Sequence, residues 1–463
     1  MKKIKKMFAV FLSVILGISI LSILSSSFDQ SKGVAAPAKK DIVKVWTFPV
    51  EKEYDKNFEW IRADFEKRNP GIKIEKEVLS WAEGIMKFDT AINAGNPPDL
   101  MFVTPAAKYI QTGLAVQIDK YVDKKTLSDY YDSALEYMKF NGKLYGLPLY
   151  MKIHTIAGNR KLLEEAGIDW KKIQQNGWTW DEFKRLAKRG SKTRPDGTKQ
   201  WGFVFHAAGT SITELLEHML ANNGLPYMFD QKGNYTYTHP RFLQTLKFIK
   251  SLIDEGIMPK ETNQITPQKR MEYFYTERAM IVGKAMPYYE VMVADNNKQI
   301  REKKAPPEYK EVDFVLLPEP HAAGQKPVTI GGVDGYSMFK QKSYRGNVKQ
   351  EEHLKNVAKV LVALTSGKAG ISAKILCLPQ VTKSGDKMWK DKYTMKPENK
   401  QMVDILFKNI LPPIQVDVDK AVKAQRIFDE VIKAEWPALL SGDITPERMY
   451  NDVKKAAKEA FGR

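Results

Sequence analysis

In the first part of the chain, the spacing of hydrophobic residues changes back and forth between that of a strand and that of a helix. Residues 42–48 form a short β-branched and aromatic run, and residues 72–78 alternate apolar and charged side chains, as strands do. Between these runs, apolar residues recur at helical spacing from Phe58 to Phe65. Residues 100–103 are wholly apolar, which is typical of a strand buried on both faces. Strands and helices therefore alternate, which predicts an α/β fold with parallel neighbouring strands.

The later part of the chain is mainly helical in pattern. Thr179 and Glu182 have the spacing of a capping box, and an apolar stripe runs from Leu354 to Val362. From about residue 400 onward nearly every segment has helical periodicity. A linker rich in Pro, Gly or Ser between two independent domains is absent after residue 40. Two lobes would therefore have to share the chain through several crossovers.

The first 40 residues have the pattern of an export signal. Residues 1–6 include four lysines, residues 7–24 are all apolar, Gly or Ser, and residues 25–40 are small and polar. The apolar run is also nearly long enough to span a bilayer, so a cleaved signal and a retained anchor both remain open. We expect residues 1–40 to be a signal or anchor segment with a linker. The protein is then exported, and is either secreted or at the extracellular face of the cytoplasmic membrane.

Composition and charge narrow the class of protein. Of 463 residues, 43% are hydrophobic and 28% charged, which excludes wholesale disorder, and a single long apolar run excludes a polytopic membrane protein. The one cysteine, Cys377, excludes an internal disulfide framework and a cysteine-built zinc site. The net charge is +18, but the lysines are spread along the chain without the motif of a nucleic-acid reader. We expect no nucleic-acid partner. We interpret the basic residues as a solvated face of the protein. The alternative is that they bind a partner, namely an anionic polymer, lipid headgroups or uronic-acid sugars.

Catalytic and metal motifs are absent from the sequence. There is no GxGxxG, Walker loop, GxSxG or HExxH, and the six histidines lack metal-ligand spacing. Asp417 and Asp419 begin an acidic run without the glycine that an EF-hand loop needs. We expect no catalytic residue, no metal and no cofactor. A pair of carboxylates in a glycosidase arrangement remains open, because the chain has 55 acidic residues.

Several short segments are notable for the order in which they occur along the chain. They are FEKRNPGI at 65–72, AGNPPDL at 94–100, NGKLYGLP at 141–148, NRKLLEEAG at 159–167 and WTWDEF at 178–183, followed by the pairs at 279–280, 317–318, 331–332 and 378–379. Together and in this order, they resemble the family 1 extracellular solute-binding proteins of bacterial ABC importers, mainly the carbohydrate-binding members. The sequence departs from that family in lacking an N-terminal lipid-anchor cysteine, in having Gly158 where a tyrosine is usual, and in the segment 283–289.

The resemblance implies a two-lobed periplasmic-binding-protein-like fold of type II. Each lobe would be a mixed sheet flanked by helices, with a multi-strand hinge and a ligand cleft between the lobes. By analogy, lobe 1 holds 41–149 plus 284–332, and lobe 2 holds 150–283 plus 333–463. A ligand that touches both lobes favours the closed state, which an ABC permease would then recognise. The resemblance also implies a carbohydrate ligand, in particular an oligosaccharide, and a monomeric protein.

Sugar binding needs flat aromatic faces and planar polar groups, and α/β clefts place ligands beyond strand ends. Some of the candidates also fit structural roles: Phe48 in the core, Lys108 on a solvated helix face, and His206 at a polar boundary. On a strand, Tyr288 and Tyr289 would point to opposite sides, so that one of them would be structural. The expected ligand-binding residues are Phe48, Glu51, Trp81, Thr104, Lys108, His206, Tyr288, Tyr289, Gly332 and Asp334.

Three other functions remain open on sequence alone. The first is an exported carbohydrate-active enzyme, such as a glycosidase or a polysaccharide lyase. The second is a receptor of the same fold for a non-sugar solute. The third is a surface adhesin or signalling receptor that closes on a ligand without transport.

Overall fold

The computed structural model describes residues 40–81, 83–208, 212–390 and 395–462, which belong to one compact unit. The predicted signal or anchor segment lies, apart from residue 40, outside the described residues. Within the described part, no helix has the length and apolar character needed to cross a membrane.

The amino-terminal elements alternate as the sequence pattern predicts. Strand β1 (Asp41–Thr47) lies between β2 (Ile72–Val78) and β3 (Leu100–Met101) and is parallel to both. Helices α1 (Tyr54–Arg68) and α2 (Gly84–Asn93) connect them. The alternation and the parallel pairing are confirmed, although β3 is shorter than the apolar run that predicts it.

Two long strands continue this sheet into the rest of the described chain. Strand β11 (Ile330–Met338) pairs antiparallel with β3 on one side and with β6 (Gly146–Asn159) on the other. Beyond β6 the sheet continues through β9 (Ala279–Ala285) and β8 (Lys199–Val204). The remaining strands are β7 (Lys192–Thr193) and β10 (Phe314–Leu317) of the same sheet, and the separate pair β4 (Lys139–Phe140) and β5 (Lys143–Leu144).

Helices cover these strands, and the predicted capping box is present. At the start of α8, Thr179 accepts a hydrogen bond from the Glu182 amide while Glu182 accepts one from the Thr179 amide, so the capping box is confirmed. The remaining α-helices are α3 (Ala107–Gln111), α4 (Lys124–Leu127), α5 (Asp132–Leu135), α6 (Arg160–Glu165), α7 (Trp170–Asn176), α8 (Trp180–Gly190), α9 (Glu214–Ala221), α10 (Pro240–Asp254), α11 (Pro267–Tyr275), α12 (Tyr288–Arg301), α13 (Gln350–Ala363), α14 (Ile371–Ile375), α15 (Lys383–Met388), α16 (Pro397–Lys408), α17 (Val418–Ile427), α18 (Lys433–Ser441) and α19 (Pro446–Phe461).

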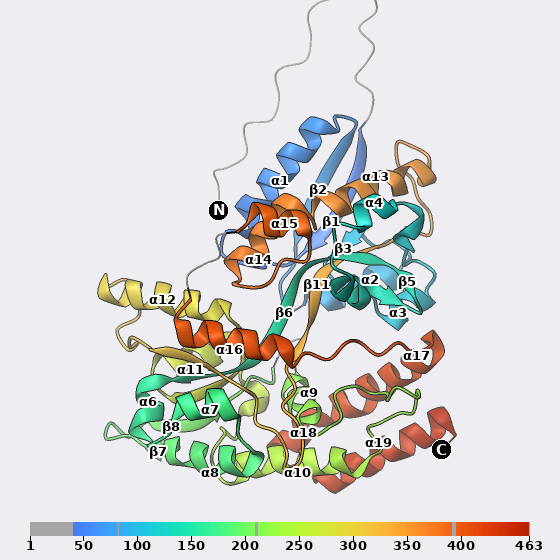
Figure 1. Ribbon diagram of the computed structural model, residues 1–463. Coiled ribbons are helices and arrows are strands. Elements are labelled where there is room, and N and C mark those ends of the chain that lie inside the picture. Colours follow the sequence, from blue (N-terminus) through green and yellow to red (C-terminus); the bar gives the residue numbers. More distant parts are fainter. Residues whose placement is uncertain (1–39, 82, 209–211, 391–394, 463) are drawn as a thin grey trace, which may run out of the picture. The chain divides into compact units, whose positions relative to one another are not determined.

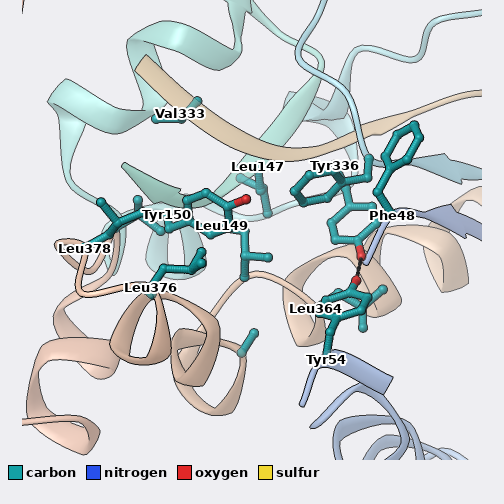
Figure 2. Close-up of a cluster of buried hydrophobic side chains, with 14 of the residues drawn as sticks. Phe48, Tyr54, Leu147, Leu149, Tyr150, Val333, Tyr336, Leu364, Leu376 and Leu378 are labelled. Atoms are coloured by element: carbon teal, nitrogen blue, oxygen red, sulfur yellow. Dashed lines mark hydrogen bonds between the residues drawn. The ribbon is translucent and has the colours of Figure 1, made fainter. Parts of the chain in front are cut away.

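Strand β6 contributes to two separate hydrophobic cores. Tyr150 belongs to the first core, and Ile156 to the second. Figure 2 shows part of the first core, where Tyr54 and Tyr336 meet through their hydroxyl groups at 2.5 Å. Thr47 also bonds the Tyr54 hydroxyl at 2.6 Å, so these buried hydroxyl groups satisfy one another.

Two contacts join segments that the expected lobe boundaries would separate. Helix α13 packs on β1 and α1, although 333–463 was expected in the second lobe (Figure 1). Strand β10 pairs with the far end of β6, from Ile156 to Asn159, although 284–332 was expected in the first lobe. The reason is the direction of β11, which begins opposite His154 and ends beside β3, and so returns the chain to the strands of the amino-terminal part.

A buried histidine bridges the start of β1 and the segment between α2 and β3. His353 on α13 donates from Nδ1 to Asp41 at 2.8 Å and from Nε2 to Asp99 at 3.0 Å, and its ring stacks on Tyr344. Burial opposes the imidazolium charge, but the hydrogen bonds and charges of Asp99 and Asp41 outweigh it and raise the pKa of His353. The charged form is therefore favoured in the folded protein.

This arrangement predicts a pH-dependent stability. Because the folded pKa of His353 lies above its unfolded value of about 6.5, its contribution is complete below that pH and is lost as pH rises through the folded pKa. We expect the melting temperature to fall over that interval. The same series on His353→Gln should lack this component, whereas His239→Gln, which changes a helix cap elsewhere, should retain it. Parallel curves for wild type and His353→Gln would contradict the assignment.

Candidate ligand-binding site

A polar face lies where β6 and β11 pair. Tyr150, Lys152 and His154 alternate along β6 and therefore point to one side of the sheet. Gly332 and Asp334 of β11 lie opposite Lys152 and Tyr150. Lys152 Nζ bonds Asp334 Oδ1 at 2.5 Å, and the Tyr150 hydroxyl donates to Asp334 Oδ2 at 3.1 Å. These five residues are called the polar crossing below.

Gly332 leaves room in the polar crossing for an aromatic ring. Its φ of +153° and its missing side chain allow Tyr137 to approach, since a Cβ here would lie 3.4 Å from that ring. The Tyr137 hydroxyl donates to the Leu411 carbonyl at 2.9 Å, and the Tyr227 hydroxyl donates to the same carbonyl at 2.8 Å. Gly332 therefore connects the crossing to two further tyrosines.

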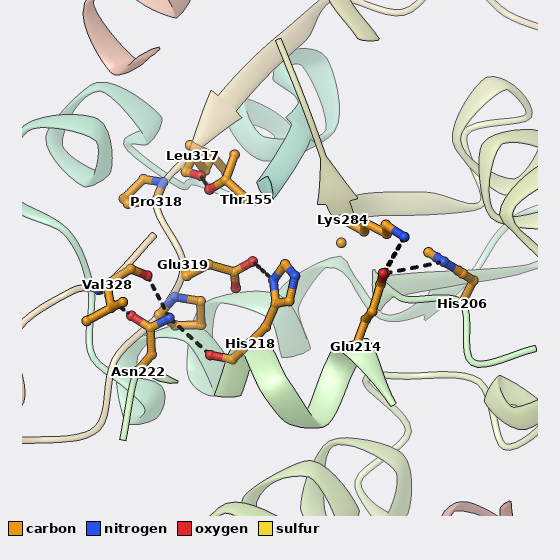
Figure 3. A network of polar contacts seen from close by, with 12 residues as sticks. Thr155, His206, Glu214, His218, Asn222, Lys284, Leu317, Pro318, Glu319 and Val328 are labelled. Atoms are coloured by element: carbon orange, nitrogen blue, oxygen red, sulfur yellow. Dashed lines mark hydrogen bonds and ion pairs between the residues drawn. The ribbon is translucent and has the colours of Figure 1, made fainter. Parts of the chain in front are cut away.

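A second charged group lies at the end of β9 (Figure 3). Lys284, in a left-handed conformation with φ of +50°, donates to Glu214 Oε1 at 2.6 Å. Glu214 begins α9 and also lies 4.0 Å from His206 Nε2. Since Ala285 pairs with Thr155, Lys284 lies beside the His154 end of the polar crossing.

Arg270 contacts the residues around this second charged group. Its side chain is fully buried and donates to the carbonyls of Gly283 at 2.5 Å and Lys284 at 3.2 Å, to His206 Nδ1 at 3.2 Å, and to the Tyr289 hydroxyl at 2.6 Å. Burial, followed by the positive charge of Arg270, strongly lowers the pKa of His206. His206 is therefore neutral at physiological pH.

An aromatic stack borders the polar crossing on the side of β1. Trp81 is 48% exposed and stacks on Phe48, with ring centroids 4.2 Å apart and planes 14° apart. Its Nε1 donates to the Pro49 carbonyl at 3.2 Å, which fixes the ring plane. Phe48 contacts Phe102, which in turn contacts Tyr150. A wide indole face is thus held in place while remaining partly open to solvent.

The other residues expected near β1 and β3 occupy different settings. Glu51 is buried, accepts from Asn57 Nδ2 at 2.9 Å and from the Glu53 amide at 2.5 Å, and has its pKa raised by burial. Thr104 is half-buried between β3 and α3. Lys108 pairs with Asp89 at 2.9 Å.

Lys108 also lines a cavity of about 280 Å³. Phe140 and Tyr227 line the same cavity, and Tyr227 shares the Leu411 carbonyl with Tyr137. The cavity is therefore connected by direct contacts to Gly332 of the polar crossing. A larger cavity of about 580 Å³, between α1, α4 and α13, shares no residue with the crossing.

Tyr288 and Tyr289 lie on the first turn of α12, so their treatment as neighbouring strand positions was wrong. The proline before them starts a helix in place of a strand. The Tyr288 hydroxyl accepts from the Lys52 amide at 3.3 Å, and Tyr289 contacts Arg270. Both tyrosines therefore have polar partners that hold them.

Four residues of this region were not among the predicted site residues: Lys152, His154, Arg270 and Lys284. One available signal was the alternation of Tyr150, Lys152 and His154 within an otherwise apolar run. Arg270 gave no such signal, because it lies on a helix with ordinary polar spacing. Among the described residues, no group of three His, Cys, Asp or Glu side chains is arranged to hold a metal ion.

Solved structures with a similar fold cover nearly the whole chain. The binding protein Lmo0181 of Listeria monocytogenes, in complex with cycloalternan, has a TM-score of 0.68 and 18% identity, covering 91% of this chain and 99% of that one. Maltose-bound MalE3 of T. maritima has a TM-score of 0.68 and 19% identity, covering 90% and 99%. These likenesses confirm the predicted fold class, a two-lobed α/β binding-protein fold of the periplasmic type.

The family follows from the sequence itself. The profile of the bacterial extracellular solute-binding proteins matches residues 46–369, and the chain belongs to this family. The maltodextrin-binding protein MdxE of Bacillus subtilis is 31% identical over 165 residues, 35% of this chain and 37% of its own. The diacetylchitobiose-binding protein DasA of Streptomyces coelicolor is 23% identical over 279 residues, 59% of each chain. A Brucella abortus binding protein is 28% identical over 202 residues, so the chain spans about half the length of this curated relative, 47%.

Proposed function

We propose that this protein captures an oligosaccharide against the polar crossing and delivers it to an ABC importer. The observation that carries the proposal is the Trp81 ring, which is half exposed and fixed by Phe48 and the Pro49 carbonyl. A flat ring of this kind covers the apolar face of a pyranose, while the donors and acceptors of the crossing satisfy its hydroxyl groups. The names of MdxE and DasA, both saccharide-binding relatives, support the same ligand class.

The two lobes meet at the paired strands β6 and β11. Lobe 1 consists of 41–149 with about 335–390, and lobe 2 of about 151–330 with 396–462, because α13 packs on β1 and β10 packs on the end of β6. A ligand that contacts Trp81 from lobe 1 and Lys284 from lobe 2 stabilises the closed arrangement. The closed form is the one presented to the permease.

The protein acts as a monomer outside the cytoplasmic membrane, either secreted or held there by residues 1–40. It releases its sugar unchanged, which distinguishes it from a carbohydrate-active enzyme. It uses no cofactor or metal for this task.

The test is a thermal-shift screen of the purified protein against neutral and acidic oligosaccharides, followed by chromatography of the recovered glycan. A ligand that binds only the folded state raises the melting temperature by mass action, by an amount that grows with concentration. We expect a shift with one glycan series and recovery of the intact glycan. A cleaved glycan would indicate an enzyme, and shifts confined to polyamines, peptides or metal ions would indicate another solute class.

A further inference from the structure

The loop between β11 and α13 carries basic side chains and no acidic ones. Residues 340–349 read KQKSYRGNVK. The basic residues are Lys340, Lys342, Arg345 and Lys349, and each of them is exposed. None of these side chains forms an ion pair with another described residue. This segment, called the basic loop below, therefore concentrates positive charge on the surface.

The basic loop is held in one shape by contacts that leave its charges exposed. The Lys342 amide donates to the Gly95 carbonyl at 2.8 Å. The Tyr344 ring stacks on His353 with ring centroids 4.4 Å apart. Gly346 leaves room for the Tyr344 hydroxyl, since a Cβ there would lie 1.8 Å from that oxygen. A partner that binds the charges therefore has little backbone entropy to overcome.

The basic loop also contacts the start of β1. Asn347 Nδ2 donates to the Lys40 carbonyl at 2.7 Å, and the Tyr344 hydroxyl donates to Asp41 Oδ1 at 3.3 Å. Lys40 is itself exposed and forms no ion pair within the described part of the chain. It adds a fifth cation at the point where the chain enters its first strand.

The carboxylates around the basic loop do not cancel this charge. Asp41 and Asp99 are buried and bind His353, whose favoured charged form offsets one of them. Glu351 and Glu352 are exposed on the first turn of α13. Against the five exposed cations, these groups leave the surface with a net positive charge.

The basic loop and the candidate site lie at opposite ends of β1. The strand begins at Asp41, beside the basic loop, and ends at Thr47. Phe48 follows and stacks on Trp81. An extended strand of this length spans about 20 Å. A partner bound at the basic loop therefore leaves the Trp81 ring accessible.

The amino-terminal segment indicates which anionic partner lies within reach. Residues 1–39 lie outside the described part, and in their sequence four lysines precede residues 7–24, which are all apolar, Gly or Ser. As a signal or as an anchor, such a segment enters a lipid bilayer. Residues 25–40 then lead directly to the start of β1, beside the basic loop. Anionic lipid headgroups attract clusters of Lys and Arg at a membrane surface.

From these observations we propose that the basic loop and Lys40 bind anionic lipid headgroups at the extracellular face of the membrane. This contact goes beyond the proposed function and does not depend on it. It holds the protein by the end of β1 that lies away from the candidate site, so the site stays open to solvent. Because salt screens exposed charges, the contact is reversible.

The test measures the binding of residues 39–463, which form one compact unit, to lipid vesicles. Omitting the preceding residues removes the apolar run, which would insert by itself. Co-sedimentation would compare phosphatidylcholine vesicles with vesicles containing about one-third phosphatidylglycerol, over a series of NaCl concentrations. We expect roughly tenfold or more tighter binding to the anionic vesicles, lost at high salt. Equal binding to both vesicles, or binding to neither, would overturn the proposal.

Variants that remove charge assign the contact to the basic loop. The triple variant Lys342→Gln, Arg345→Gln and Lys349→Gln should weaken binding to the anionic vesicles roughly tenfold. The charge-conserving variant Lys342→Arg, Arg345→Lys and Lys349→Arg should bind as the wild type does. Unchanged binding of the Gln variant would overturn the proposal.

Helix α19 provides a matched control. Lys454, Lys455 and Lys458 are exposed there and form no ion pair with other described residues. Their triple Gln variant has the same net charge as the variant of the basic loop and should bind vesicles as the wild type does. Both triple variants should keep the wild-type melting temperature, because every substituted side chain is exposed. An equal loss of binding in both would show that total charge attracts the protein, and would overturn the proposal.

A soluble polymer separates a lipid surface from other polyanions. Poly(glycerol phosphate) carries phosphodiester charges like those of phosphatidylglycerol but forms no bilayer. In competition at equal phosphate concentration, we expect the vesicles to retain the protein. Displacement by the polymer would assign the basic loop to a polyanionic chain and would overturn the membrane proposal.

Discussion

Trp81→Ala is expected to weaken oligosaccharide binding by about 10- to 100-fold. The indole is 48% exposed and stacks on Phe48, so the exposed part of the ring can contact a ligand. Losing the burial and stacking of such a ring costs roughly 1.5–3 kcal/mol of binding free energy. Isothermal titration with the glycan that gives the largest thermal shift measures this loss directly.

Trp60 provides a matched control for this substitution. It is 43% exposed on α1, where it meets Trp389 edge-on and lies under Lys368, and it shares no contact with Phe48. Trp60→Ala should therefore leave glycan affinity within about twofold of wild type. Both variants should remain folded, since each removes a partly solvated side chain. An unchanged affinity in Trp81→Ala would exclude this ring as the sugar platform.

Gly335→Ala is expected to destabilise the protein by about 3 kcal/mol. A Cβ at this position would lie 2.2 Å from the Leu147 carbonyl oxygen and 2.7 Å from Pro148 Cα, both backbone atoms that cannot turn aside. The register between β6 and β11 shifts between Asp334 and Gly335, so displacement there also moves Asp334. Urea unfolding should show a lower midpoint, and glycan binding should weaken with it.

Gly71→Ala is the corresponding control. No heavy atom lies within 4 Å of a Cβ built there, and its backbone is not in the left-handed region. Its free energy of unfolding should differ from that of the wild type by no more than about 0.5 kcal/mol. Equal stability of the two alanine variants would show that the β6–β11 crossing tolerates a side chain and can relax around it.

The local pattern predicted the local elements well. The strands predicted at 42–48 and 72–78 and the capping box at Thr179 each depend on neighbouring residues. All three are present, the first strand at Asp41–Thr47. The lobe boundaries depend on the direction in which a strand crosses the sheet, which a local pattern does not specify. Nothing near Asp334 specifies that β11 runs toward β3.

The candidate site was predictable only where a single residue carried its own signal. Trp81 stood out because a tryptophan among polar neighbours fits a core poorly, and it is half exposed. Lys284 and Glu214 are 70 residues apart, so only the fold brings them together. Arg270 could not be recognised from its neighbours, since its partners come from β8's end, β9 and α12.

The position of β11 also bears on when this protein can fold. Met101 of β3 pairs with Ser337 of β11, so β3 lacks this neighbour until the chain has been made almost to residue 340. Such distant pairings slow folding, because loop closure must precede the contacts that compensate for it. Under the proposed export, β3 therefore remains without β11 while most of the chain crosses the membrane. This order of strands favours the passage of an unfolded chain.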